Sequence, residues 1–503
     1  MLFNSFSFFV FFPMTVLVYL LIPKKTREVW LLVVSSFFYL FQNPKYSLFL
    51  TISIMSTYVT GRLIYVLRNK KNWAVEKVKK MCVASLVFCI LINFGILCSL
   101  KYLSFFGTLV ERAAGMISLE ITAPSFSFLL PLGISFYTFQ VMGYVIDVYK
   151  GKCIPEKNII RYALFVSFFP LIVSGPIARG KHLLPQFEKL KHINLWSYDR
   201  ITKGLSMMLW GYFIKTVIAD RIAIFVNGVY ATYQEQSGVL LIAAAILFSV
   251  QIYCDFAGYS EIAIGAACIM GIEVNENFRA PYFSKSIREF WHRWHISLST
   301  WFRDYVYIPM GGGRCQPTRK HANILFTFIL SGIWHGASLH FWVWGFVHGI
   351  FQVIEDLLTK TLKRIELKFQ IKTDCFSYQW MKQLLTFLFV TIAWVFFRAQ
   401  SIGEAVRYLY YSVIHFRMES LFDSSLFKVG LAQSEMVILF FAIVILFIFD
   451  YLKYKNGEKL SEVLLRQNLL FRWMIYLILF FSILIFGIYG PEYTACQFIY
   501  VQF

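Results

Sequence analysis

The sequence predicts an all-α polytopic membrane protein, and its composition and its apolar segments carry that prediction. Hydrophobic residues make up 58% and charged residues 15% of the 503 residues, whereas a soluble protein contains about 45–50% apolar and about 25% charged residues. The 58% share of 503 residues is about 290 apolar residues. A helix that crosses a bilayer needs about 20–25 of them, so this chain can supply at most about a dozen spans.

Candidate spans follow one another along the chain without a repeat or a Ser/Gly linker, so we expect one integral membrane domain over residues 1–503. The segments 28–42 and 161–178 are short enough to be re-entrant or tilted. The first segment is expected to be retained, because it lacks the basic start and the small-residue cleavage site of a signal peptide. The apolar segments are residues 3–22, 28–42, 46–67, 81–106, 125–146, 161–178, 203–230, 238–271, 321–355, 381–399, 434–452 and 470–490.

The net charge of +20 is explained by the membrane and needs no nucleic acid partner, because Lys and Arg concentrate in cytoplasmic loops. Basic clusters at residues 24–27, 68–80 and 150–161 all fall on one side if the N-terminus lies outside. The nine cysteines include no CxxC pair. We therefore expect free thiols rather than a disulfide framework or a zinc cluster.

The segment 275–321 departs from the membrane pattern, because it is too polar to face lipid and too aromatic for a free loop. We expect an amphipathic helix at the membrane interface or a helix buried against the bundle. If the segment is helical, Arg288, Trp291, His295 and Ser299 fall close to one face.

Two histidine clusters are the candidates for chemistry. The first holds His292 and His295, and the second holds His335, which lies within a long apolar segment. An ionisable side chain at bilayer depth is costly, so it marks a functional site by default. Gly332 and Gly336 surround His335 at small-xxx-small spacing, which lets another helix approach closely. We therefore expect His335 to meet the first cluster in the core.

Histidine suits proton transfer because its usual pKa of about 6.5 lies near neutrality. One imidazole would remove a proton from an attacking hydroxyl group, and the other would hold the carbonyl or the leaving group. Two alternatives stay open. His335 could only satisfy a hydrogen bond between helices, the role we expect for His340 and His348. A zinc site at His292 and His295 lacks further ligands nearby, so we expect no metal.

A carboxylate at Asp255, with Glu261 close by in sequence, is a second kind of candidate. It could shape an entrance for a polar substrate, but a structural ion pair is the stronger interpretation, because membrane carboxylates usually find an internal cation. The expected partners are Arg279, Arg288 or Arg303. The candidates for lining a substrate passage are Trp291, His292, Ser299, Trp334, Asp255 and Arg303. Both tryptophans would count as packing residues without the histidines beside them.

Four motifs together resemble the bacterial membrane-bound O-acyltransferase family. The likeness is greatest to its alginate O-acetyltransferase branch, with the teichoic-acid D-alanyl transfer protein as a cousin. It is strong over residues 175–398, within a family-like core of residues 125–400, and the long motif around His295 is its most specific part. The motifs are Ser174-Gly175-Pro176-Ile177, Asp255-Phe256-Ala257-Gly258-Tyr259-Ser260, the segment 290–305 that opens Phe290-Trp291-His292-Arg293-Trp294-His295, and Trp334-His335-Gly336.

The resemblance implies a bundle of about 11–12 transmembrane or re-entrant helices around a tunnel in the bacterial plasma (inner) membrane. His335 matches the family's catalytic histidine, and His295 matches its second, more variable polar residue. The donor would be a cytoplasmic thioester, acetyl-CoA or an acyl carrier, with no bound cofactor. The acyl group would leave toward the outside, where an SGNH-hydrolase-like extracytoplasmic acyltransferase passes it to a polysaccharide.

The C-terminal segment 498–503 resembles the aromatic tail that ends many members of this branch, with Val501 where an aromatic residue is more usual. We expect Tyr500 to reach the tunnel and to accept the acyl group as a phenyl ester. A phenol of pKa about 10 is a weak nucleophile until a base such as His335 deprotonates it. An interfacial aromatic anchor is the competing interpretation.

We therefore predict an O-acyltransferase that moves an acyl group, with acetyl as the first choice, onto an exported or cell-surface polysaccharide. His335 would be the base and His295 would assist. The main alternative is a membrane transporter or exporter of a polar envelope precursor, because discontinuous spans and buried ionisable residues also describe transporters. Against it, the chain shows no evident paired halves. A scaffold of an envelope complex is the third interpretation.

Overall fold

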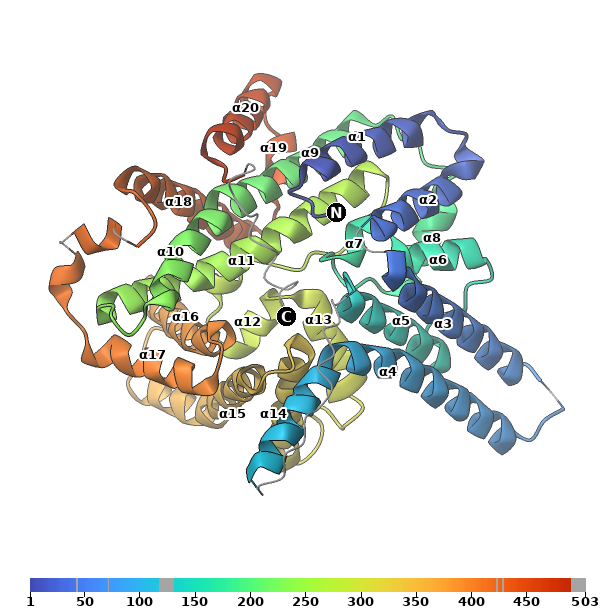
Figure 1. Cartoon of the computed structure of the whole chain (residues 1–503), viewed down its shortest axis with the longest axis horizontal. Coiled ribbons are helices and arrows are strands. Elements are labelled where there is room, and N and C mark those ends of the chain that lie inside the picture. Colours follow the sequence, from blue (N-terminus) through green and yellow to red (C-terminus); the bar gives the residue numbers. More distant parts are fainter. Residues whose placement is uncertain (42–43, 71, 117–130, 422–423, 428, 490–503) are drawn as a thin grey trace. The chain divides into compact units, whose positions relative to one another are not determined.

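A computed structural model describes residues 1–41, 44–70, 72–116, 131–421, 424–427 and 429–489. All regular structure within these residues is helical, which confirms the predicted all-α class (Figure 1). Six helical segments among them are long and apolar enough to cross a membrane, which confirms the polytopic character. They are Pro44–Arg68, Val75–Leu103, Gly238–Ile269, Phe376–Arg398, Gln433–Asn456 and Leu469–Phe486.

Packing divides the chain into two compact units. The first comprises Met1–Leu205 and Ala263–Asn275, and the second comprises Ser206–Ile262 and Glu276–Phe503. These are units of packing, and the expectation of a single functional domain stays a prediction.

The first unit holds an aromatic core close to the N-terminus. Its helices are α1 (Phe6–Leu21), α2 (Arg27–Leu40), α3 (Ser47–Arg68), α4 (Val75–Met116), α5 (Ile134–Tyr149), α6 (Ile159–Ser167), α7 (Phe169–Ile172) and α8 (Gly180–Lys189). The ring of Phe38 lies 6.5 Å from that of Phe8 and 5.6 Å from that of Phe169, so α1, α2 and α7 share one core. The short segment 161–178 is broken, because α6 ends at Ser167 and the four-residue α7 follows it.

The second unit begins in a long, nearly continuous helix. The end of α9 (Tyr198–Tyr212) runs into the π-helical segment η3 (Phe213–Ala219) and then into α10 (Asp220–Ala231). The following helix, α11 (Gly238–Ile269), lies against this rod. A Cβ atom on Gly258 would lie 2.8 Å from the carbonyl oxygen of Gly211, so the two backbones approach more closely than any side chain allows.

The apolar segment 321–355 folds as two helices rather than one, and this is a correction to the hydropathy profile. α14 (Pro317–His335) turns directly into α15 (Leu339–Lys368), and the two pack along each other (Figure 1). The approach depends on glycine, as expected. A Cβ atom on Gly332 would lie 2.2 Å from the carbonyl oxygen of Phe341, and one on Gly345 would lie 2.3 Å from that of Phe328.

The remaining helices of the second unit complete its core. They are η4 (Pro281–Phe283), α12 (Ile287–Arg293), α13 (Ile296–Phe302), η5 (Arg303–Tyr307), α16 (Phe376–Arg398), α17 (Ile402–Ile414), η6 (Met418–Leu421), η7 (Ser424–Phe427), α18 (Gln433–Asn456), α19 (Leu460–Leu465) and α20 (Leu469–Phe486). Three fully buried indoles mark the centre of this core: the ring of Trp394 lies 5.0 Å from that of Trp294 and 5.6 Å from that of Trp344. These aromatic rings pack around the histidine-bearing segments.

Candidate active site

His295 lies at a break between two short helices, and this corrects the expectation of one helix through residues 288–299. α12 ends at Arg293, and α13 begins at Ile296. His295 has φ of +42°, a left-handed conformation that non-glycine residues rarely adopt. The four residues expected on one helix face are therefore distributed over two helices. Trp294, between the two helices, is 1% exposed, as expected for a segment that packs against the bundle.

Backbone hydrogen bonds to the preceding loop explain the break. The amide of Ile296 donates to the carbonyl oxygen of Asn277 at 2.9 Å, and the amide of Arg279 donates to that of Arg293 at 3.0 Å. The side-chain oxygen of Asn277 also accepts a hydrogen bond from the amide of Ser297 at 3.3 Å. These contacts replace bonds that a continuous helix would make, so the loop at residues 277–279 sets the position of His295.

His335 lies at the C-terminal end of α14, where the chain turns, rather than in the middle of a span. Its ring contacts the indole of Trp344, at 4.9 Å between centroids, and the ring of Phe397, at 5.4 Å. The residue is 4% exposed. Helices α15 and α16 therefore enclose the imidazole with aromatic rings.

The structure brings His295 and His335 to the same indole. The ring centroid of Trp334 lies 6.2 Å from that of His295 and 4.8 Å from that of His335. His295 is 1% exposed, and burial lowers its pKa from 6.5 to about 3. The expected proximity of the two histidines is therefore present, and His295 is a neutral imidazole at physiological pH. Their catalytic roles stay a prediction.

A cavity of about 640 Å³ opens beside the histidine-bearing helices. Four of the six side chains predicted to line a substrate passage are in its wall: Trp291, His292, Ser299 and Arg303. Trp334 and Asp255 are not among its lining residues. The full lining comprises Arg288, Trp291, His292, Ile296, Leu298, Ser299, Thr300, Phe302, Arg303, Tyr307, Gly313, Lys320, Ile324, Thr327, Phe328, Ser331 and Gln352.

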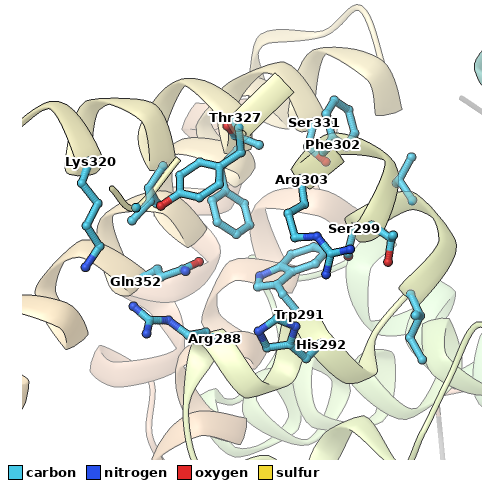
Figure 2. A pocket seen from close by; sticks show the side chains of 17 residues that line it. Arg288, Trp291, His292, Ser299, Phe302, Arg303, Lys320, Thr327, Ser331 and Gln352 are labelled. Atoms are coloured by element: carbon cyan, nitrogen blue, oxygen red, sulfur yellow. The ribbon is translucent and has the colours of Figure 1, made fainter. Parts of the chain in front are cut away.

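The wall of this cavity carries three cations, one more than the two carboxylates, Asp304 and Asp356, that pair with them from outside the lining. Arg288, Arg303 and Lys320 line it, and its described lining includes no carboxylate. Figure 2 shows Arg288, Lys320 and Gln352 along one side of the space, with Arg303 across from them. The cavity therefore suits an anionic ligand, since Arg and Lys donate charge-assisted hydrogen bonds to phosphate and carboxylate groups.

The cavity reaches the immediate neighbours of both histidines. Ile296 follows His295 in sequence, and Ser331 lies one helical turn before His335 on α14. Neither imidazole is itself part of the wall of this cavity. A ligand in this space would thus lie next to the two helix ends that carry the histidines.

Asp255 is held in a buried ion cluster that none of the predicted partners joins. The Nζ atom of Lys215 lies 2.5 Å from Asp255 and 2.8 Å from Asp220, and all three side chains are at most 3% exposed. The expected pairing with Arg279, Arg288 or Arg303 is therefore wrong, whereas the structural interpretation of Asp255 is supported. Lys215, in the middle of the apolar segment 203–230, was the signal that could have identified its partner.

Several residues of the site are not evident from the sequence. Lys320, Ser331 and Gln352 line the cavity, and Asp356 binds two of its cations. The basic residues of segment 275–321 were the available signal for Lys320. The predicted acyl carrier Tyr500 lies outside the described residues.

Comparison with known proteins gives consistent results. The model of the membrane-bound O-acyltransferase family matches residues 36–399. A probable alginate O-acetylase of Pseudomonas syringae pv. tomato is 33% identical over 464 residues, covering 91% of this chain and 84% of the relative. A peptidoglycan O-acetyltransferase of Helicobacter pylori is 30% identical, covering 81% and 79%. A teichoic acid D-alanyltransferase of Bacillus subtilis is 31% identical over 242 residues, covering 46% and 60%.

These matches confirm the resemblance carried by the motifs and favour acyl transfer over the transporter and scaffold interpretations. The family model spans both histidine segments and the helices that enclose them. The chain is a multi-pass membrane acyltransferase that belongs to the membrane-bound O-acyltransferase family.

Proposed function

We propose that this enzyme takes an acyl group, acetyl by preference, from a cytoplasmic thioester and passes it outward for O-acylation of an exported or cell-surface polysaccharide. The basic cavity is the observation that carries the donor assignment. Acetyl-CoA and the phosphopantetheine arm of an acyl carrier both present phosphate groups, which Arg288, Arg303 and Lys320 would bind at the cavity wall. A basic surface also favours the cytoplasmic side.

The division of labour between the histidines follows from the low pKa of His295. A group with a pKa of about 3 is a poor base near neutrality, but a neutral imidazole can donate one hydrogen bond through its N–H. His295 would hold the thioester carbonyl oxygen in this way, and His335 would be the general base.

The transfer step balances with these two residues. His335 takes the proton of the acceptor hydroxyl, and the oxygen forms a bond to the carbonyl carbon. The carbon–sulfur bond then breaks, and the leaving thiolate recovers the proton from His335. The products are an ester and a free thiol.

The acceptor and its partners come from the relatives' names and the motifs. Relatives act on alginate, peptidoglycan or teichoic acid, so we propose a cell-envelope polysaccharide in a bacterial plasma membrane. An SGNH-hydrolase-like extracytoplasmic acyltransferase would complete the transfer. Tyr500 would carry the acyl group between them as a phenyl ester. Mass spectrometry of the C-terminal peptide during turnover tests this relay, and a Tyr500 that never gains acyl mass would eliminate it.

The experiment that tests the function is thioester consumption by the purified enzyme in lipid nanodiscs. Acetyl-CoA and candidate polysaccharides are supplied, and free thiol and ester are measured together. His335→Ala should lower the rate by about 10²–10⁴-fold, the usual contribution of a general base. His192→Ala, at an exposed histidine, is the control. A His335→Ala protein that consumes thioester at the wild-type rate would refute the assignment.

A further inference from the structure

Two adjacent carboxylates on α15 bind the first turns of two other helices. The carboxylate oxygens of Glu355 accept hydrogen bonds from the amides of Ile287, at 3.3 Å, and Arg288, at 3.2 Å. Asp356 accepts from the guanidinium of Arg288 at 2.9 Å and from the ammonium of Lys320 at 2.7 Å. Together, Glu355 and Asp356 tie α12 and α14 to α15, and we call this pair the carboxylate brace.

Glu355 supplies hydrogen-bond acceptors to the first amides of α12. The first amides of a helix have no acceptor within the helix. The hydroxyl oxygen of Ser286 accepts a hydrogen bond from the amide of Glu289 at 3.0 Å. The carboxylate of Glu355 accepts the hydrogen bonds of the two preceding amides, those of Ile287 and Arg288. A carboxylate at a helix N-terminus is also favoured by the helix dipole. The start of α12 is therefore fixed to α15 rather than left to solvent.

Asp356 gathers three basic side chains. Besides Arg288 and Lys320, it lies 3.0 Å from Nε2 of His321. Although partial burial acts to raise the pKa of Asp356, hydrogen bonds from Lys320, His321 and Arg288 bring it down to about 2. The carboxylate is therefore charged throughout the physiological range.

The brace acts on the cavity wall because Arg288 and Lys320 are two of its three cations. The third, Arg303, has its own carboxylate, Asp304, at 3.0 Å. Arg288 also lines a second cavity of about 590 Å³ between α15 and α16. Asp356 lines this second cavity as well, so its contact with Arg288 holds the guanidinium at the boundary between the two spaces.

The braced helices are also those that end at the histidines. α12 stops at Arg293, two residues before His295, and α14 stops at His335. Partly exposed ion pairs contribute little to the stability of a fold, whereas misplacement by about 1 Å can cost an enzyme about 10²-fold in rate. The contacts of Glu355 and Asp356 therefore matter more for the positions of α12 and α14 than for the stability of the fold.

We propose that Glu355 and Asp356 are positioning residues of the acyl-transfer site: Asp356 orients Arg288 and Lys320 toward the anionic part of the donor, and Glu355 fixes the helix that leads to His295. This inference rests on the proposed thioester donor. Neither carboxylate touches the reacting atoms in this scheme.

The kinetic test compares Asp356→Asn, Asp356→Glu and Asp374→Asn, the last at an exposed aspartate in the loop before α16, with acetyl-CoA as the probe. Asp356→Asn should raise KM for the thioester by roughly tenfold, because a cation that Asp356 no longer positions loses one charge-assisted contact to the donor, while kcat stays within about twofold. Removal of a negative charge without loss of positioning would instead lower KM, and that result also overturns the role of Asp356. Asp356→Glu should restore most of the affinity, and Asp374→Asn should match wild type. A wild-type KM in Asp356→Asn overturns the role of Asp356.

A double variant guards against a folding defect. Lys320→Met should raise KM as Asp356→Asn does, and the two changes together should cost no more than the larger one, because they break the same contact. Additive losses would contradict the shared role. If the Asp356→Asn protein aggregates, the Asp356→Glu and Lys320→Met variants, alone and combined, test the same contact while the carboxylate charge at position 356 is retained.

Hydrogen exchange tests Glu355 without any activity. Glu355→Ala should speed exchange of the Ile287 and Arg288 amides by about tenfold, because each loses its acceptor, and Glu235→Ala, at an exposed glutamate, should not. Unchanged exchange overturns the role of Glu355. A wild-type enzyme that consumes no thioester would instead refute the proposed function. The exchange result would still show whether Glu355 holds the start of α12.

Discussion

His295, at the break between α12 and α13, and His335, at the end of α14, both pack against the indole of Trp334, at centroid distances of 6.2 and 4.8 Å. The indole therefore sets the spacing between the two candidate catalytic rings. Trp334 is 6% exposed, so it is held in place by the surrounding core.

Replacement of Trp334 should reduce turnover more than stability. Trp334→Ala should lower kcat by about 10²-fold, because both imidazoles lose the surface that orients them, whereas Trp334→Phe should lose much less. The measurement is thioester consumption in nanodiscs at saturating donor. Trp196→Phe, at an indole that is 65% exposed, is the control, and a Trp334→Ala enzyme with wild-type kcat would contradict the spacing role.

The buried His295 predicts a pH dependence of stability. Its pKa is about 3 in the folded protein, against 6.5 as the usual value, so below pH 6.5 the unfolded chain binds a proton that the folded chain does not. Stability from the neutral imidazole is fully present above pH 6.5 and is lost as the pH falls toward 3.

Thermal unfolding in detergent at about pH 7.5 and about pH 5 measures this effect. The decrease in Tm on acidification should be larger for wild type than for His295→Gln, which has no group to titrate at this position. Equal decreases in the two proteins would show that His295 does not contribute.

The close packing of α14 on α15 predicts a steric defect in Gly345→Ala. The new Cβ atom would lie 2.3 Å from the carbonyl oxygen of Phe328, and forcing helices apart in a packed core costs about 1–3 kcal/mol. Gly403→Ala is the matched control, since its Cβ would meet Arg407 at 4.0 Å. Tm and monodisperse yield are measured, and equal values for the two variants would contradict the packing.

The buried cluster around Lys215 predicts a large effect of removing its charge. Lys215→Met should destabilise the protein by about 3–5 kcal/mol, because Asp255 and Asp220 would be left as uncompensated buried carboxylates. The triple change with Asp255→Asn and Asp220→Asn should recover much of that loss. Unfolding free energy is the measurement. If Lys215→Met instead leaves stability unchanged and alters donor or acceptor KM, Asp255 belongs to a substrate passage.

Much of the fold could be predicted because hydropathy is a local property. α3, α11, α16, α18 and α20 each overlap one apolar segment read from about 20 residues at a time, although only α11 lies wholly inside its segment. The errors of the hydropathy profile have the same cause, because the profile reads only local polarity. The turn after His335 interrupts an apolar segment without a change in polarity, so hydropathy could not separate α14 from α15.

Motifs predicted which residues lie together at the candidate site better than they predicted its geometry. His295, His335 and the cavity residues Trp291, His292, Ser299 and Arg303 were all evident as residue types. The helix break at His295, however, depends on hydrogen bonds that Asn277 accepts and that the amide of Arg279 donates. Such contacts leave no periodic trace in the sequence.

Residue types alone thus determine that this chain enters a membrane, that it is helical, and that its motifs are those of its family. The tertiary structure decides which groups meet: Lys215 with Asp255, separated by 40 positions, and Lys320 with Asp356, separated by 36. Side chains this far apart are joined by helix packing, and packing depends on the shape of every intervening helix. No short window of sequence contains that information.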